Sequence, residues 1–200
     1  MHMSGGNLSS PLFLEGEWMK KLFEIKLVKN PKRKKKYPYK IKFADRRVVP
    51  LPSQYDFDDS YIQSKGCIIA AFYMALRFVS VKKSMVQCLK YLQDNYSKGN
   101  HKNYNLEIVC KAINRLAPGS PAEFYRKITK GKMKKALKAG HMILYTEKEP
   151  IHTAVLMWNG KKVIRFSNGK YKTVTVAQEI HKRSGDPWYG GCVIVKNSKQ

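Results

Sequence analysis

The most constraining feature of the sequence is an apolar run from Cys67 to Phe78, in which Arg77 is the only charged residue. The run is too long for an ordinary strand and has no polar face, so it predicts a helix that is buried on most sides. Gly66 precedes the run and supplies a turn at the start of this helix. The sequence therefore predicts a central helix that the rest of the domain covers.

Further helices and strands are predicted on either side of Gly140. Helices are expected over Ser84–Asn95, over Leu106–Ala117 with Asn105 as the cap, over Lys130–Ala139, and around Ala177–Lys182. Strands are expected over His141–Thr146, His152–Trp158, Lys162–Phe166, Tyr171–Val176 and Cys192–Val195. A chain with helices in its first part and antiparallel strands in its second part has an α+β fold. We expect the helix that begins at Cys67 to face the sheet.

The N-terminal quarter of the chain has a different composition. We expect residues 1–17 to be a flexible N-terminus and residues 18–47 to be a basic, hairpin-like segment, with strands over Leu22–Val28 and Tyr37–Phe43. Residues 48–200 then form the main part of a single domain, and Val48–Ser60 is a proline-containing segment that leads into the central helix.

The chain has a formal net charge of +25, from 39 Lys and Arg against 14 Asp and Glu. The excess is concentrated in two runs, Lys20–Arg47 and Lys127–Lys138. Such a charge predicts attraction to a nucleic acid, an anionic membrane or an acidic protein. Nucleic acid lacks support, because no zinc-finger spacing or RNA-binding sheet signature is present. No apolar run is long enough for a membrane span and no signal peptide is evident, so we expect a cytoplasmic protein, or one that a secretion system delivers into a target cell.

The four cysteines have no paired spacing, which predicts reduced thiols and no zinc site. No metal or cofactor is expected. Cys88, Cys110 and Cys192 fall at apolar positions of predicted helices and of the last strand, so we expect them to be buried. Cys67 differs because a glycine turn precedes it and a helix follows it. Helix N-termini carry partial positive charge, which favours the thiolate, and the thiolate is the nucleophilic form.

A thiol hydrolase also needs a general base, a residue that orients the base, and donors for the oxyanion. His152 and His141 both open predicted strands, whereas His2, His101 and His181 lie in terminal, loop or exposed positions. His152 is favoured because the hairpin after it returns Asn168 to the same end of the sheet. For the oxyanion, the backbone N–H of Cys67 pairs with a side-chain donor, and the residues leave both Gln54 and Gln63 open.

The predicted hairpin can be tested by its register. A three-residue loop, Asn159–Lys161, places Asn168 opposite His152 on the same face of the sheet. A two-residue loop places Ser167 opposite His152 and turns Asn168 to the other face unless a bulge intervenes. Catalysis therefore predicts the first register or a bulge. In the alternative interpretation His152 is an edge-strand histidine and Asn168-Gly169 is a plain turn.

Six short segments resemble the papain-like superfamily, and within it the bacteriocin-processing, double-glycine-type peptidases. They are Val49–Gln54, Ile62–Cys67, Ala70–Leu76, Leu137–Leu144, His152–Leu156 and Val163–Asn168. In that family a glutamine after a proline-containing strand is the oxyanion donor, a Gly-Cys pair opens the central helix, and an Asp or Asn follows the histidine by sixteen residues. The resemblance implies a papain-like fold, a Cys67-His152-Asn168 triad and Gln54 as the oxyanion donor. Gln63 then falls at a variable position.

The expected function is a cysteine protease that cleaves a peptide bond in a specific protein, as a bacterial toxin or effector. Its expected partners are a protein substrate with an acidic surface and an acidic immunity or inhibitor protein. Many relatives have glycine where this chain has Ile68, which leaves the substrate open. Two alternatives remain: a glutamine deamidase or transglutaminase-like enzyme using the same thioester, and a catalytically inactive basic module that binds nucleic acid.

Overall fold

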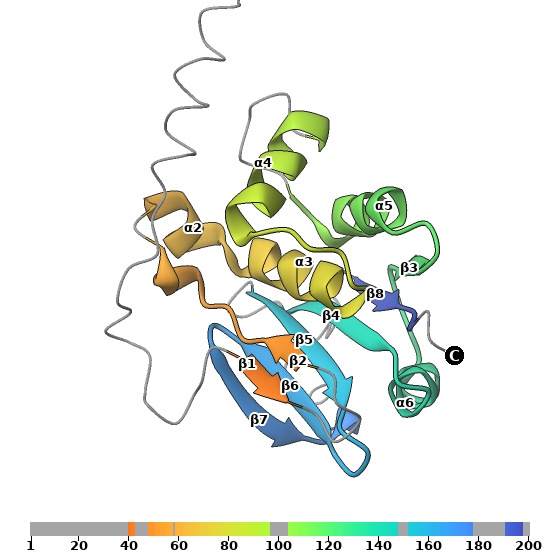
Figure 1. Ribbon diagram of the computed structural model, residues 1–200. Coiled ribbons are helices and arrows are strands. Elements are labelled where there is room, and N and C mark those ends of the chain that lie inside the picture. Colours follow the sequence, from red (N-terminus) through yellow and green to blue (C-terminus); the bar gives the residue numbers. More distant parts are fainter. Residues whose placement is uncertain are drawn as a thin grey trace, which may run out of the picture.

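The computed structural model describes residues 40–42, 48–57, 59–96, 104–147, 152–177 and 191–197 (Figure 1). The predicted flexible N-terminus, most of the predicted basic hairpin and most of the helix expected around Ala177–Lys182 lie outside the described residues.

The fold is α+β, as predicted, and is built on a six-stranded antiparallel sheet. The strands run in the order β3-β8-β4-β5-β6-β7. Their bounds are β3 Ala122–Tyr125, β4 Met142–Glu147, β5 His152–Trp158, β6 Val163–Ser167, β7 Lys170–Val174 and β8 Cys192–Val195. A separate two-stranded sheet pairs β1 (Lys40–Lys42) with β2 (Val48–Pro50).

The helices are η1 (Gln54–Asp56), α2 (Ser60–Lys65), α3 (Cys67–Phe78), α4 (Met85–Tyr96), α5 (Leu106–Leu116) and α6 (Lys130–Lys138). α3 is the predicted central helix, with the predicted bounds. It packs between the sheet on one side and α4 and α5 on the other (Figure 1). α6 packs on the opposite face of the sheet.

The sheet therefore separates two apolar clusters. Side chains alternate along a strand, so successive residues of β5 point to opposite faces. Val155 and Met157 belong to the larger cluster under α3, whereas Ala154 and Leu156 belong to the smaller cluster under α6. His152 falls in the second series, a placement that bears directly on the candidate site.

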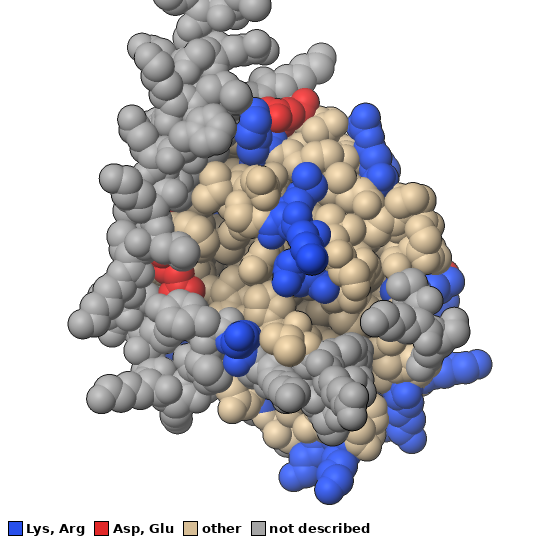
Figure 2. Space-filling view, in the orientation of Figure 1, with Lys and Arg blue, Asp and Glu red and all other residues tan. Residues whose placement is uncertain are grey.

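The described surface is strongly basic. Figure 2 shows many lysine and arginine side chains and few acidic ones on the face it draws. The second basic run of the sequence forms α6, which buries Met133, Ala136 and Leu137 and exposes its lysines. The first basic run lies largely outside the described residues.

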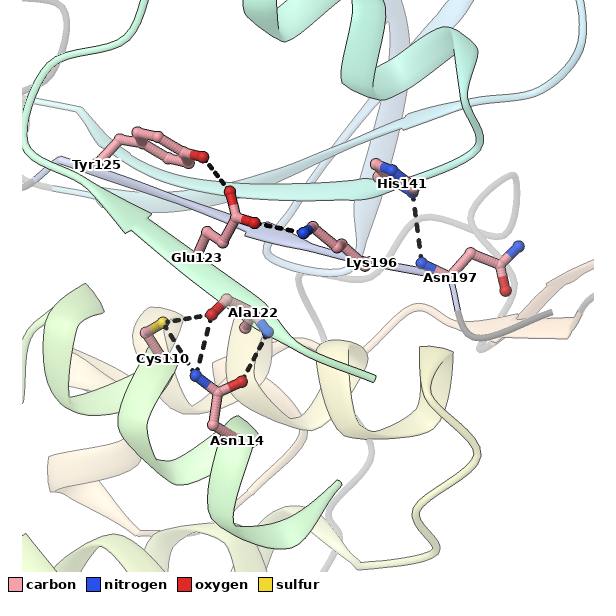
Figure 3. Close-up of polar contacts among 8 residues, drawn as sticks. All are labelled: Cys110, Asn114, Ala122, Glu123, Tyr125, His141, Lys196 and Asn197. Carbon is pink, nitrogen blue, oxygen red and sulfur yellow. Dashed lines mark hydrogen bonds and ion pairs between the residues drawn. The ribbon is translucent and has the colours of Figure 1, made fainter. Parts of the chain in front are cut away.

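α2 and β3 are among the elements that the sequence did not predict. α2 begins at a cap, where the side chain of Asp59 accepts from the N–H of Ile62 (2.8 Å). β3 is held by a side chain from α5: Asn114 accepts from the N–H of Ala122 (2.6 Å) and donates to its carbonyl (2.9 Å) (Figure 3). The Asn114 amide thus satisfies the backbone of Ala122, whose strand is also paired with β8.

Candidate active site

Gly66 joins α2 directly to α3 and fixes Cys67 as the first residue of α3. It is buried, and its N–H donates to the carbonyl of Ile62 (2.8 Å). A Cβ at Gly66 would lie 2.2 Å from that carbonyl oxygen, so only glycine allows this junction. The sequence around Cys67 therefore places a thiol at the N-terminus of a helix, where partial positive charge favours an anion.

The four cysteines divide into one partly exposed thiol and three buried ones. Cys67 is partly exposed, whereas Cys88, Cys110 and Cys192 are buried, as predicted. Burial raises the pKa of Cys88 and of Cys192 to about 12, and that of Cys110 to about 11. These three remain thiols at neutral pH, which leaves Cys67 as the candidate nucleophile.

Tyr61, on α2, lies near the thiol of Cys67. Its pKa is raised to about 12, first by burial, then by the neighbouring Tyr104, and then by the negative charge of a Cys67 thiolate. The phenol of Tyr61 is thus neutral near neutral pH.

Gln54 begins the short helix η1 and is buried. A capping box holds this turn: the N–H of Ser53 donates to Asp56 (3.1 Å), and the Ser53 hydroxyl accepts from Tyr55 (3.3 Å). Gln54 Nε2 donates to the carbonyl of Gln63, which fixes the orientation of the amide. Because an amide nitrogen carries two N–H groups, one donor remains. Gln54 Oε1 is buried and accepts from no residue that the structure describes.

Gln63, the other predicted oxyanion donor, has a different environment. Its Nε2 donates to the carbonyl of Phe57 (2.7 Å) and ties α2 to the chain that precedes it. Its carbonyl meanwhile holds Gln54. The two glutamines are therefore in contact, with Gln54 more buried and Gln63 supporting it.

Asn168 lies in the turn between β6 and β7. Ser167 pairs with Lys170, so the turn has two residues, Asn168 and Gly169, with φ angles of 47° and 69°. Positive φ at both positions is what a type I′ hairpin turn requires. The N–H of Gly169 donates to the carbonyl of Pro52 (2.9 Å) and so ties the turn to the segment before Gln54. Asn168 Oδ1 is buried and has no donor among the described residues.

The register of the β5–β6 hairpin corrects both predicted registers. Trp158 pairs with Val163, which leaves a four-residue loop, Asn159–Lys162. The reason is a side chain: Asn159 Oδ1 accepts from the N–H groups of Lys161 (3.0 Å) and Lys162 (2.8 Å) and closes the longer turn. Asn168 therefore does not lie opposite His152 on the same face, and the orienting role inferred from that register loses its geometric basis.

In the observed register Ser167 shares a face with His152. His152 Nε2 and Ser167 Oγ are 2.6 Å apart, so the hydroxyl is a hydrogen-bond partner of the imidazole. The sequence contained a signal for this contact, since Ser167 ends the strand next to the one that His152 begins. The loop length decided which residue met the histidine.

Hydrogen bonds join the segments that carry the four predicted site residues at one end of the sheet, although none of these bonds joins two of the four residues themselves. His152 contacts Ser167, Gly169 contacts Pro52, and Gln54 contacts Gln63, which lies one helical turn before Cys67. In Figure 1 the start of β5 and the β6–β7 turn lie on the same side of the molecule as α2 and the first turn of α3.

His141, the competing base, lies at the other end of the sheet. It precedes β4, which is antiparallel to β5, so it sits near Trp158, about 20 Å along the strand from His152. Its Nδ1 accepts from the N–H of Asn197 (3.4 Å) (Figure 3). Burial and then the charge of Lys196 lower the pKa of His141.

A buried polar network lies on the same face as His152. Arg165 forms an ion pair with Glu147 (2.8 Å) and donates to the Tyr145 hydroxyl (3.0 Å), which donates to Glu147 (3.0 Å). Glu147 pairs directly with His152 across the strands. Sequence reasoning missed this network, although a Glu and an Arg within apolar strands were a signal for it.

Cys67 and His152 belong to opposite sides of the sheet. α3 packs on the face of Val155 and Met157, whereas His152 shares the other face with Ala154. Since His152 is the first residue of β5, its imidazole has to turn around the end of that strand to meet the thiol. The site thus brings the candidate groups to one end of the sheet with the base hydrogen-bonded to Ser167.

Comparison of the chain with known protein families, curated proteins and solved structures finds no match. In the described part of the chain, no group of three or more His, Cys, Asp or Glu residues could hold a metal ion. None of the described helices is long and apolar enough to cross a membrane.

Proposed function

We propose that the chain is a thiol hydrolase, a papain-like cysteine peptidase that cleaves a specific protein. The observation that carries the proposal is the separation of Cys67 from the other cysteines: it is partly exposed at a helix N-terminus, and they are buried with raised pKa values. In the proposed reaction the Cys67 thiolate attacks the scissile carbonyl. His152 takes the thiol proton and returns it to the leaving amine, and water then hydrolyses the thioester.

The proposed oxyanion donors are the N–H of Cys67 and the second N–H of Gln54 Nε2. Backbone N–H groups in the first turn of a helix have no partner within that helix. Gln54 is suited to the second position because its amide is buried and fixed by the Gln63 carbonyl. Such preorganised donors stabilise charge where it develops in the transition state.

The proposed orienting residue for His152 is Ser167, in place of the predicted Asn168. The 2.6 Å contact between Ser167 Oγ and His152 Nε2 supports this assignment. In the proposed reaction Nδ1 is the ring nitrogen that exchanges a proton with Cys67. Asn168 Oδ1, which has no partner among the described residues, is a candidate acceptor for a substrate N–H at the same end of the sheet.

The test is alkylation of the protein by iodoacetamide over a range of pH, with each cysteine followed by mass spectrometry. Cys67 is expected to react at least about tenfold faster than Cys88, Cys110 and Cys192 near neutral pH. His152→Ala is expected to slow the reaction of Cys67, and the control His141→Ala to leave it unchanged. Equal labelling of all four thiols, or labelling indifferent to His152→Ala, contradicts the proposal.

One observation favours a second candidate, a binding protein without catalysis: α3 and the His152 side chain lie on opposite sides of the sheet. An inert Cys67 would support it.

For a reactive Cys67, mass spectrometry of a candidate target separates peptidase from deamidase. A cut backbone indicates a peptidase, and a gain of about one dalton indicates deamidation through the same thioester.

A further inference from the structure

A groove of about 480 Å³ lies at the other end of β5, between α6 and the hairpins. α6 contributes Lys134 and Lys138, the β5–β6 loop contributes Lys161 and Lys162, and Trp158 lies between them. The loop is fixed, because the Asn159 side chain holds its backbone. The groove is within the size range of ligand sites in proteins, and it is separate from the candidate active site.

The rim of the groove is uniformly positive. Its four lysines are exposed, and none forms an ion pair with a described residue. No Asp or Glu is among the residues that line the groove in the described part of the chain. Four like charges around one hollow repel one another, so an anionic occupant gains from all of them. Figure 2 shows lysine and arginine side chains over the α6 side of the molecule, at the lower right.

The floor of the groove is apolar. Leu137, Val163, Val174 and Val176 are buried beneath it, and Trp158 is half-buried. An occupant that fits both floor and rim carries apolar side chains on one side and carboxylates beside them. Single-stranded nucleic acid fits less well, because it is held by successive aromatic platforms and often by arginine, and this groove has one aromatic residue and no arginine in its described lining.

We propose that this groove binds an acidic, amphipathic segment of a partner protein. Apolar side chains of the segment lie over Trp158 and Leu137, and its carboxylates meet Lys134 and Lys138 on one side and Lys161 and Lys162 on the other. Lys134 and Lys138 are one helical turn apart, about 6 Å along α6, so they face successive carboxylates of a helical or extended segment. The proposal does not depend on catalysis by Cys67.

The experiment measures binding of a fluorescein-labelled peptide of alternating Glu and Leu by fluorescence anisotropy. The protein carries Cys67→Ala, so that cleavage of the probe cannot mimic weak binding. The rim variant is Lys134→Glu with Lys161→Glu, and its matched control is Lys65→Glu with Lys82→Glu, which changes the net charge equally at exposed lysines outside the groove. Trp158→Ala removes the indole ring from the floor, and Trp158→Phe retains an aromatic ring there.

We expect the rim variant to weaken binding about tenfold or more, because each substitution replaces an attraction to a peptide carboxylate by a repulsion. The control variant is expected to change binding less than about threefold. Trp158→Ala is expected to weaken it about as much as the rim variant, and Trp158→Phe to retain most of it. Equal losses from rim and control variants would overturn the proposal, because binding would then follow net charge alone. Tighter, groove-dependent binding of oligothymidylate than of the peptide would overturn it in favour of nucleic acid.

Discussion

The two ends of strand β5 carry opposite kinds of polar group. At the His152 end two polar pairs are wholly or partly buried: Ser167 Oγ is hydrogen-bonded to His152, and Arg165 forms an ion pair with Glu147. At the Trp158 end, Lys161 and Lys162 are exposed and make no ion pair with a described residue. The first arrangement suits chemistry, which needs atoms in fixed positions. The second suits recognition of charge, which mobile lysines provide.

The largest effect is expected at the His152 end of β5, from loss of the buried ion pair between Arg165 and Glu147. Arg165→Met leaves Glu147 buried, with 2% side-chain exposure, and without its cation. We expect the free energy of unfolding to fall by about 3–5 kcal/mol, measured by urea denaturation. The matched control is Lys111→Met, which removes a surface pair with Glu107 (3.0 Å) and should cost no more than about 0.5 kcal/mol. Adding Glu147→Leu to Arg165→Met should recover much of the loss, because no buried charge then remains unpaired. Similar losses from Arg165→Met and Lys111→Met would contradict a buried pair.

A second pair of variants tests the junction that places Cys67. Gly66→Ala sets a Cβ 2.2 Å from the Ile62 carbonyl, and we expect it to lower the free energy of unfolding by about 1–3 kcal/mol. Gly131→Ala is its control within α6, where an added Cβ meets nothing within 4 Å. It should raise stability by about 0.5–1 kcal/mol, because alanine favours a helix more than glycine does. If Gly66→Ala is as stable as the wild type, the α2–α3 junction is looser than described.

The third prediction decides between Ser167 and Asn168 as the residue that orients His152. Ser167→Ala removes the 2.6 Å contact and is expected to slow alkylation of Cys67 about fivefold, the equivalent of one hydrogen bond of about 1 kcal/mol. Asn168→Gly keeps the left-handed turn and removes only the carboxamide, so the rate should stay within about twofold. A larger effect of Asn168→Gly would return the orienting role to Asn168.

How well the sequence predicted each element depended on whether local residues determine it. The helix Cys67–Phe78 and the strands His152–Trp158 and Cys192–Val195 have their predicted bounds, because their apolar patterns are continuous. β3 was missed because its backbone partners are the distant Asn114 and β8.

The site was predicted less completely than the fold. Its residues come to one end of the sheet, but the side chain of Asn159 lengthens the β5–β6 loop by one residue over the register that catalysis required. A change of one residue moves every later side chain to the opposite face. Ser167 rather than Asn168 therefore meets His152, a result that the choice of turn type controls and that apolar patterning does not reveal.

The smallest expected effect concerns His141, which lies near the groove end of β5 and has a lowered pKa, first from burial and then from the charge of Lys196. A lowered pKa means that folding favours neutral histidine, so the unfolded chain binds more protons below its ordinary pKa of about 6.5. Stability from this residue is therefore present above about pH 6.5 and is lost as the pH falls through the lowered, folded pKa. The free energy of unfolding of the wild type should fall more between about pH 8 and about pH 5 than that of His141→Gln. Parallel pH profiles would show that His141 is as well hydrated as in the unfolded chain, and that the groove end of the sheet is more open than the His152 end.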